Sequence, residues 1–543
     1  MQDELLFEIG TEEIPAGYIR PAIADMAKMI KTRLAELGLD HGAIKTAATP
    51  RRLTLCVEGL AETQEDRREE VTGPPKAAAF DSDGKPTKAA EGFARSRGVG
   101  LDDLQIVQTP KGEYLMVVVE NKGEKTAELL PGLLTGIIHH LSFPKSMRWG
   151  SGTASFARPI QWILARFAGE VIPCRINDVR SGPVTRGHRF MAPQAFEVSN
   201  FDNYLEKLRR AHVISDPEER RLAVLGEITE TAREAGGRIM EDDELVDTVA
   251  NLVEEPHAVR GTFDEKFLAL PREVLITSMR EHQKYFAIID DQGELLPNFI
   301  AVNNTATRDQ TLAVEGHQRV LRARLEDALF FFKEDQNHRL SDRVGQLSGV
   351  VFQAGLGTML EKTERLTALA GWLAEKTAPR AATDAKRTAL LAKADLLTEM
   401  VNEFPSLQGT MGRAYAMLDR EPPEVAQGIA EHYMPVRAGT PLPESDCGAI
   451  VSLADRIDTI AGCFGIGKQP TGTTDPYGLR RLALGLLHII SARGYTLSLA
   501  ELTAKALELY GGKVTEKIPA AQAAVLDFIR GRYVNDLLGR GIP

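Results

Sequence analysis

The spacing of hydrophobic residues changes near residue 320, and this change constrains the fold more than any other feature of the sequence. Before it, apolar runs typical of strands, at residues 5–9 and 53–57, alternate with helical spacing, as at residues 21–37. Beyond it only helical spacing continues, most clearly at residues 320–333. The sequence therefore predicts a multidomain α+β fold, with mixed α/β modules in the N-terminal half and an all-α second half.

Length and composition describe a folded globular chain. Its 543 residues are 43% hydrophobic and 26% charged, which suits roughly three or four domains. No apolar run reaches the roughly 20 residues that cross a bilayer, and the first residues lack the layout of a signal peptide. The four cysteines are far apart and form no CxxC pair, which argues against a disulfide framework or zinc knuckle. We therefore expect a cytoplasmic protein with no membrane partner.

Charge is unevenly distributed along a chain whose formal net charge is −11. Residues 142–190 carry eight basic and two acidic side chains, whereas residues 211–271 carry six basic and fifteen acidic ones. A basic tract inside an acidic chain indicates a face for an anionic partner. The alternative is that oppositely charged surfaces meet between domains.

A Walker-like spacing occurs at residues 462–468 (GCFGIGK). Gln469 stands where a phosphate-binding loop has the Ser or Thr that ligates magnesium, and a helical pattern precedes the motif in place of a strand. We therefore interpret the segment as a glycine-rich loop that closes a helix, from which Lys468 can still contact a phosphate.

Two aspartates on predicted helices, Asp395 and Asp455, match part of the pattern of HD-type metal phosphohydrolases. That pattern needs a His-Asp doublet and a distant Asp, but Ala394 replaces the doublet histidine. Because two carboxylates without an imidazole hold a metal weakly, we predict a degenerate HD-like helical domain with no metal and no catalytic residue. The alternative for Asp455 and Arg456 is a charged pair on a helix surface.

Residues 279–286 (MREHQKYF) mix cations, an amide and aromatic side chains, including Arg280 and Lys284. Such a cluster can hold a phosphate and stack a base. The alternative is a polar helix end that runs into a strand at residues 285–289.

Several long segments resemble the β-subunit family of bacterial heterotetrameric glycyl-tRNA synthetases. They occur in the family order and cover nearly the whole chain: residues 5–17 (LLFEIGTEEIPAG), 143–150 (FPKSMRWG), 156–162 (FARPIQW), 322–328 (RARLEDA), 331–335 (FFKED) and 469–481 (QPTGTTDPYGLRR).

The resemblance implies a domain order. We expect α/β modules over residues 1–320, partly similar to the phenylalanyl-synthetase β subunit, and an HD-like helical domain over residues 321–495. Residues 496–543 would begin a helical anticodon-binding domain, and the sequence ends before most of that domain.

The resemblance also implies a function and partners. The chain would bind and position tRNA(Gly) for glycylation at a separate α subunit in an α2β2 complex. ATP and Mg²⁺ would act in the α subunit, with no cofactor in this chain. Since tRNA is a polyanion, affinity should come from basic side chains. The candidates are Arg148, Arg158, Arg186, Arg189, Arg280, Lys284, Arg456, Lys468, Arg480 and Arg481. For any one of them the alternative is a surface or interdomain salt bridge.

Two other functions stay open. The chain could be a hydrolase, either an HD phosphohydrolase or an editing deacylase, although no deacylase nucleophile stands out. It could also be a pure scaffold that binds protein and no RNA.

Overall fold

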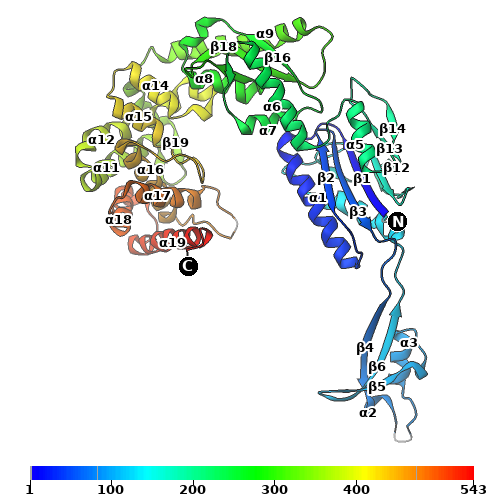
Figure 1. Cartoon of the computed structure of the whole chain (residues 1–543). Helices are drawn as coiled ribbons and strands as arrows, with labels where there is room; N and C mark the ends of the chain where they lie inside the picture. The colour runs from blue at the N-terminus through cyan, green and yellow to red at the C-terminus, as the bar shows by residue number, and fades with distance from the viewer. Residues whose placement is uncertain (1–2, 82–83, 473, 543) are drawn as a thin grey trace. The chain divides into compact units, whose positions relative to one another are not determined.

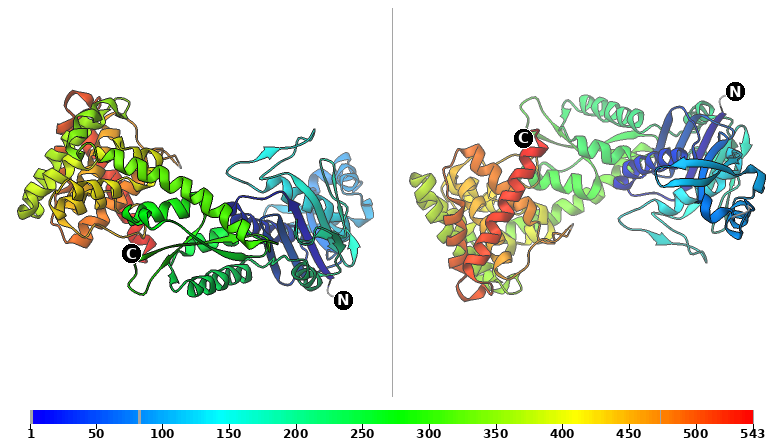
Figure 2. Two further views of the ribbon diagram at one scale, coloured as in Figure 1. Left: turned by 90° about the horizontal axis from the view of Figure 1, so that it is seen from above. Right: turned by 90° about the horizontal axis from the view of Figure 1, so that it is seen from below.

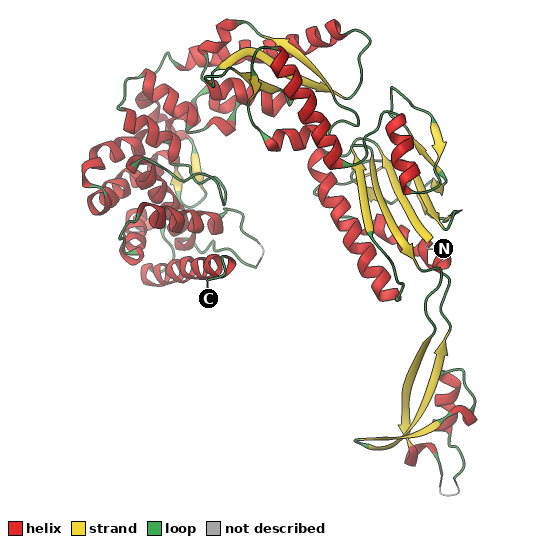
Figure 3. Ribbon diagram, viewed as in Figure 1, coloured by secondary structure: helices red, strands yellow, loops and turns green. Residues whose placement is uncertain are grey.

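The computed structural model describes residues 3–81, 84–472 and 474–542. The chain forms two compact units, the first from Met1–Gly261 and Lys284–Glu315, the second from Thr262–Gln283 and Gly316–Pro543. It combines several sheets with many helices, as the predicted fold class requires (Figure 1, Figure 3).

A mixed sheet forms the centre of the first unit. Its strands are β1 (Asp3–Thr11), β2 (Ile44–Thr49), β3 (Arg52–Leu60), β9 (Ile160–Phe167), β10 (Glu170–Val171), β11 (Arg175–Ile176) and β12 (Val179–Gly182). They follow the order β11-β12-β9-β1-β3-β2, with β10 paired to β9. β1 is antiparallel to both neighbours, so that Phe7 stands opposite Leu55 on one side and Ala165 on the other.

Helices cover both faces of this sheet, which explains why the first strand reads as an uninterrupted apolar run. Leu5 and Phe7 pack into a core with α1 (Ala16–Leu37) and α4 (Thr126–His140). On the other face Leu6 packs against α5 (Phe201–Arg210). The predicted helix at residues 21–37 is confirmed and begins five residues earlier.

Residues 67–121 form a small module of their own. Its strands β4 (Arg67–Pro75), β5 (Gln105–Thr109) and β6 (Gly112–Asn121) pair in the order β4-β6-β5. Two helices, α2 (Lys76–Ala79) and α3 (Lys88–Ser96), pack on them around a core that contains Ala79, Ala90 and Leu115. A short 3-10 turn, η1 (Leu101–Asp103), precedes β5.

A further sheet in the first unit has the order β15-β17-β18-β16. Its strands are β15 (Arg238–Ile239), β16 (His257–Thr262), β17 (Phe286–Ile289) and β18 (Leu295–Asn303), and α6 (Pro217–Glu234) and α7 (Asp243–Ala250) supply the other half of its core. Asp216 caps α6 by accepting hydrogen bonds from the amides of Glu218 and Glu219. Two short hairpins complete the unit, β7 (Met147–Arg148) with β8 (Ser155–Phe156), and β13 (Val184–Arg186) with β14 (Ala195–Glu197).

Three fully buried charged side chains meet beside the central sheet. Arg52 donates to Glu254 Oε1 at 3.0 Å, and Glu8 Oε1 lies 3.9 Å from the same guanidinium. Thr49 also donates to Glu254 Oε1, at 2.6 Å, and Trp162 donates to Glu8 Oε1, at 3.0 Å. Burial alone would raise the pKa of the Glu254 carboxyl, but Arg52 and the Thr49 hydroxyl outweigh it, and the net pKa is lowered. The network joins four strands and the segment after α7.

Arg220 of α6 is a second buried cation, and backbone carbonyls take the place of a carboxylate partner. Its guanidinium donates to the carbonyl oxygens of Ala250, Ala48 and Ile214, at 2.6, 2.7 and 2.6 Å. Burial lowers the pKa of Arg220 to about 10. One side chain thus joins the central sheet, the segment before α6 and the end of α7.

Apart from one small hairpin, the described residues of the second unit form helices and the loops between them. Its elements are η2 (Glu265–Ala269), α8 (Arg272–Thr277), the π-helix η3 (Ser278–Gln283), α9 (Gln310–Asp335) from residue 316, α10 (Leu340–Arg343), η4 (Val344–Gly349), β19 (Val351–Gln353), β20 (Gly357–Thr358), α11 (Met359–Thr377), η5 (Pro379–Ala381), α12 (Ala382–Leu391), η6 (Ala394–Leu397), α13 (Glu399–Glu403), η7 (Pro405–Leu407), α14 (Thr410–Leu418), α15 (Pro423–Glu431), α16 (Asp446–Gly465), α17 (Leu479–Arg493), α18 (Leu499–Tyr510), η8 (Gly511–Lys513) and α19 (Ile518–Gly539).

Helix α16 is the centre of this unit. It is buried along most of its length, and its core also contains side chains of α11, α12, α17, α18 and α19. α19, drawn in red, packs on α16, α17 and α18 (Figure 2). Leu502 of α18 and Val525 of α19 lie in this core. The described part of residues 496–543, a segment predicted to begin a separate domain, shares its core with the preceding helices.

Two details differ from the sequence predictions. β19 and β20 form a hairpin beyond residue 320, where only helices were expected; with three and two residues, these strands are too short to show an alternating pattern. The Gly, Pro and Lys content of residues 73–92 is typical of a mobile excursion, yet these residues include α2 and the start of α3. Residues 82 and 83 of that stretch lie outside the described residues.

All four cysteines, Cys56, Cys174, Cys447 and Cys463, are free and buried. Burial raises the pKa of each thiol, in the case of Cys447 to about 11.

Substitution of Glu254 tests the buried network. Glu254→Gln leaves the buried Arg52 guanidinium with Glu8, 3.9 Å away, as its remaining carboxylate in this network, so we expect the first unit to lose about 3–5 kcal/mol of unfolding free energy. Urea denaturation of the full chain measures it. Glu218→Gln is the control, because Glu218 pairs with Arg20 at an exposed site and should change stability by less than about 1 kcal/mol. Equal effects of the two substitutions would contradict a structural role for the network.

Candidate functional site

Two arginines of the basic tract contact the acidic loop that follows β1. Arg189 forms ion pairs with Glu12 and with Glu13, the latter at 2.8 Å. Arg158 donates from Nε to the backbone oxygen of Glu13 at 3.1 Å. Both arginines are half-buried, so the loop at residues 12–13 holds two of the predicted RNA-binding cations against the protein.

Trp162 carries three guanidinium groups over its indole ring. Those of Arg51, Arg52 and Arg186 lie 5.6, 5.7 and 5.8 Å from the ring centroid. On β1, a Cβ at Gly10 would overlap the indole, so glycine is required for this close packing. Of the three arginines only Arg186 is exposed.

Arg148 lies at the end of β7, beside the loop that leads to β8, and its side chain is exposed. Together with Arg186 it is the most accessible of the predicted cations in the first unit.

The segment that contains Arg280 and Lys284 is a helix end followed by a strand. Arg280 lies in η3, and Lys284 has a left-handed backbone, with φ of 58°, just before β17. The edge of His282 faces the Phe404 ring, with centroids 5.5 Å apart. The alternative interpretation of this cluster, a polar helix end that runs into a strand, matches the local structure.

At the positions compared with the HD-type pattern, two lysine side chains contact the Asp455 carboxylate. Lys362 of α11 lies 2.7 Å from Asp455 Oδ1, and Lys393 lies 2.7 Å from Asp455 Oδ2. Burial would raise the pKa of Asp455, but these two ammonium groups lower it far more. Lys362 also contacts Asp458 at 3.0 Å. Two ammonium groups thus occupy both oxygens of the carboxylate that would ligate a metal.

His432 completes this lysine cluster. Its Nε2 accepts from Lys393 at 2.9 Å, and its Nδ1 donates to the backbone oxygen of Ile429 at 2.6 Å. Burial, assisted by Lys393, lowers the pKa of His432 to about 3, so the imidazole is neutral.

Asp395 is bound elsewhere. Its Oδ2 accepts from the backbone amides of Gly409 and Gly412, at 2.6 and 3.0 Å. Burial raises the pKa of Asp395 to about 6, although both amide bonds oppose the rise. Asp395 positions the loop before α14, while Asp455 binds lysines. Within the described ranges, no group of three or more His, Cys, Asp or Glu side chains is arranged to hold a metal ion.

Arg456 is not on a helix surface, so the alternative of a charged surface pair with Asp455 is wrong. Its side chain is buried and donates to Ser452 Oγ at 3.1 Å and to the backbone oxygen of Pro435 at 2.9 Å. A surface position was inferred wrongly because other helices surround α16 along most of its length.

The Walker-like segment closes a helix, as interpreted from the sequence. Gly462 belongs to α16, and Gly467, with φ of 71°, follows the helix end. Lys468 is exposed and lies 5.7 Å from the Tyr477 ring centroid. Nearby in the sequence, Arg480 donates to the backbone oxygen of Gly472 at 2.6 Å, and Arg481 is exposed.

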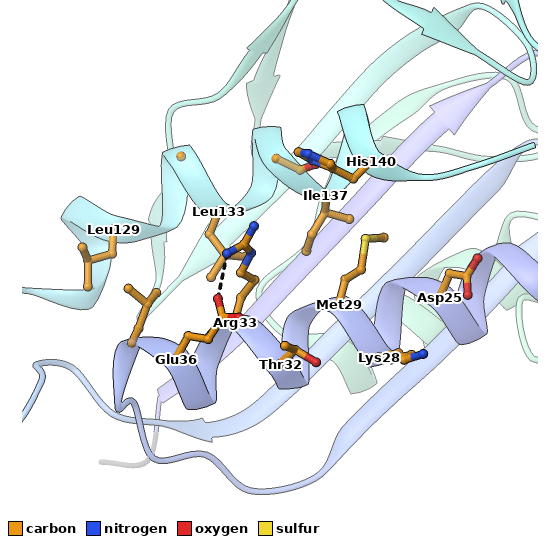
Figure 4. A pocket seen from close by; sticks show the side chains of 13 residues that line it. Asp25, Lys28, Met29, Thr32, Arg33, Glu36, Leu129, Leu133, Ile137 and His140 are labelled. Carbon is orange, nitrogen blue, oxygen red and sulfur yellow. Dashed lines mark hydrogen bonds and ion pairs between the residues drawn. The ribbon is translucent and has the colours of Figure 1, made fainter.

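Another concave site lies between α1 and α4 (Figure 4). This groove of about 800 Å³ has apolar side chains such as Met29, Leu133 and Ile137, and an ion pair of 2.7 Å between Arg33 and Glu36 at its rim. None of the predicted site residues lines it.

Sequence reasoning missed the lysine cluster and the exposed Phe190 near the end of the basic tract. Lys393 lies two residues before Asp395, within the HD-like motif itself, but its partners Asp455 and His432 are distant in sequence. The exposure of an aromatic ring depends on tertiary packing, so the sequence does not reveal that Phe190 is exposed. Its position beside Arg189 in the basic tract is the one sequence feature that points to a binding role.

No helix among the described residues is both long and apolar enough to span a membrane.

Comparison with known proteins gives a consistent result. The family profile described as "Glycyl-tRNA synthetase beta subunit" matches residues 5–543. The glycine–tRNA ligase β subunit of Geobacter sp. (strain M21) is 50% identical over 540 residues, which is 99% of this chain and 79% of that protein. Those of Syntrophus aciditrophicus (50% over 543 residues) and Geobacter sulfurreducens (51% over 540 residues) also match over 79% of their own lengths. Since half of the residues are identical across nearly the whole length, the chain belongs to the glycyl-tRNA synthetase β-subunit family, whose members form part of a ligase.

Proposed function

We propose that this chain binds tRNA(Gly) and positions it for ATP-dependent glycylation at the active site of a separate α subunit, in a cytoplasmic α2β2 complex. The observation that carries the proposal is the match to glycine–tRNA ligase β subunits over residues 5–543. In this proposal ATP, Mg²⁺ and the activation of glycine belong to the α subunit. The β chain contributes binding energy and orientation for the tRNA.

The distribution of exposed cations supports the proposal. Arg148 and Arg186 in the first unit, and Lys468 and Arg481 in the second, are exposed. Such side chains can replace counterions along a phosphate backbone. Arg158, Arg189 and Arg480 are partly engaged by protein oxygens, and Arg456 is enclosed, so we assign them to positioning the surfaces from which the exposed cations project.

The metal phosphohydrolase alternative is disfavoured by the lysine cluster. A divalent ion bound to Asp455 would have to displace Lys362 and Lys393, each 2.7 Å from that carboxylate. The deacylase alternative has no specific group in the structure to support it.

Glycylation of tRNA(Gly) by this chain alone, by its α subunit alone and by the mixture tests the function. We expect only the mixture to charge tRNA. Charging by this chain alone would place the catalytic site here. A mixture in which this chain does not raise the activity of the α subunit, and does not bind tRNA, would favour the scaffold alternative.

The salt dependence of tRNA binding tests the individual cations. In anisotropy titrations with labelled tRNA(Gly), we expect Arg186→Ala and Arg481→Ala each to reduce the slope of log affinity against log salt by about one. Arg233→Ala is the control, because Arg233 is exposed but lies in the acidic tract and pairs with Glu230 at 2.6 Å. Unchanged slopes for both variants would remove them from the RNA-binding surface.

The stability of the second unit should depend on His432 below neutral pH. Between pH 6.5 and about 3 the unfolded histidine is protonated while the folded one stays neutral. The unfolded state therefore binds more protons, and stability falls as pH falls, by up to about 1.4 kcal/mol per pH unit. Asp395, with its pKa raised to about 6, acts in the opposite sense, because it is protonated first in the folded state.

The difference between the wild-type chain and His432→Gln isolates the histidine contribution. We expect the wild type to lose more stability than the variant when urea denaturation is compared at pH 7 and pH 4.5. Identical losses would show that His432 is not buried in neutral form.

A further inference from the structure

The side chain of Phe190 is unusually accessible. It is 71% exposed and lies in the turn that follows β13, at the end of the basic tract. Most large aromatic side chains of a folded chain are buried, so an aromatic ring held in solvent among cationic residues points to a ligand that stacks.

The local backbone fixes this exposure. The buried His188 accepts hydrogen bonds at Nδ1 from the amides of Phe190 and Met191, both at 3.2 Å, and its own amide donates to the Ala211 oxygen at 2.9 Å. A Cβ at Gly187 would overlap the backbone oxygen of Ala192. The turn is therefore tightly packed at its base and holds the Phe190 ring outward.

A cavity of about 720 Å³ opens beside the ring. It is lined by Phe190, Met191, His212, Thr305, Ala306 and Arg308. The amide of Ala306 lies 3.3 Å from Met191 Sδ, which joins the two chain segments that form the walls. His212 is oriented by a contact of 2.9 Å between Nδ1 and a Glu255 oxygen.

The lining combines the groups that bind single-stranded nucleic acid. An aromatic face stacks a base, a guanidinium meets a phosphate, and hydroxyl and imidazole groups can bond a base edge or a ribose. Arg308 is exposed, and no hydrogen bond or ion pair engages its guanidinium among the residues that the structure describes. A base inside a duplex cannot stack on Phe190, because its faces are already covered by neighbouring base pairs.

We propose that this cavity binds one unpaired nucleotide of tRNA, from the 3′ end or the anticodon loop, with its base on Phe190 and its phosphate against Arg308. The inference rests on the proposed tRNA-binding function and adds a specific contact to it. A protein partner fits the cavity less well, since Arg308, Thr305 and His212 make much of its lining polar.

Titration of labelled tRNA(Gly) into the full chain tests the stacking contact. Phe190→Ala should weaken binding about tenfold, Phe190→Trp should keep it, and Phe190→Leu should behave as Phe190→Ala, because only an aromatic ring stacks. Arg308→Ala should lower the salt slope by about one. Leu222→Ala is the matched control, because Leu222 is 63% exposed on α6 in the same unit and should bind as the wild type does.

Two modified tRNAs identify the nucleotide. One lacks the unpaired 3′-terminal nucleotides, and the other carries abasic sites in place of the anticodon-loop bases. The tRNA for which the wild-type chain and Phe190→Ala bind equally well is the one that has lost the stacked base. If both tRNAs retain the tenfold difference, the proposal is overturned.

The outcomes separate this inference from the function on which it rests. If wild-type binding depends on salt but Phe190→Ala binds equally well, the cavity proposal fails and the tRNA-binding function stands. If the wild-type chain does not bind tRNA, both fail. If Phe190→Ala binds tRNA normally but no longer co-purifies with the α subunit, the cavity holds protein and the proposal is again overturned.

Discussion

The pairing of Arg52 with Glu254 and Glu8 is the interaction on which the first unit depends. A guanidinium and two carboxylates are withdrawn completely from water, and each such charge is tolerable only with a partner in place. The partners come from β1, β3 and the segment after α7, so the charges can be satisfied only when the central sheet and that segment are both formed. The network therefore favours one arrangement of chain segments that an apolar core alone would specify less strictly.

The second unit meets the same requirement with lysines. Asp455 and Asp458 on the central helix α16 are held by Lys362, Lys393 and Arg365. The positive charge that balances these two buried carboxylates therefore comes from the chain itself.

The sequence predicted what local periodicity determines. The apolar run at residues 5–9 and the helical spacing of residues 21–37 correspond to β1 and α1. The change near residue 320 lies close to residue 316, where the larger segment of the second unit begins. Burial by distant segments was not predictable. Arginine is usually found on the surface, but Arg456 lies inside a helical core, and phenylalanine is usually buried, but Phe190 is exposed. The exposed cations were proposed by charge counting alone, and their contacts with RNA stay predictions.

The burial of all four cysteines has a consequence for solution work. Alkylating reagents attack the thiolate, and thiols whose pKa is raised in an apolar interior are slow to form it at neutral pH. A variant such as Leu222→Cys would then carry the one rapidly reacting thiol of a chain whose native cysteines need no removal. Fluorescent or spin labels could thus be attached at a chosen site beside the Phe190 cavity, or on any exposed helix, while the buried native cysteines react only slowly.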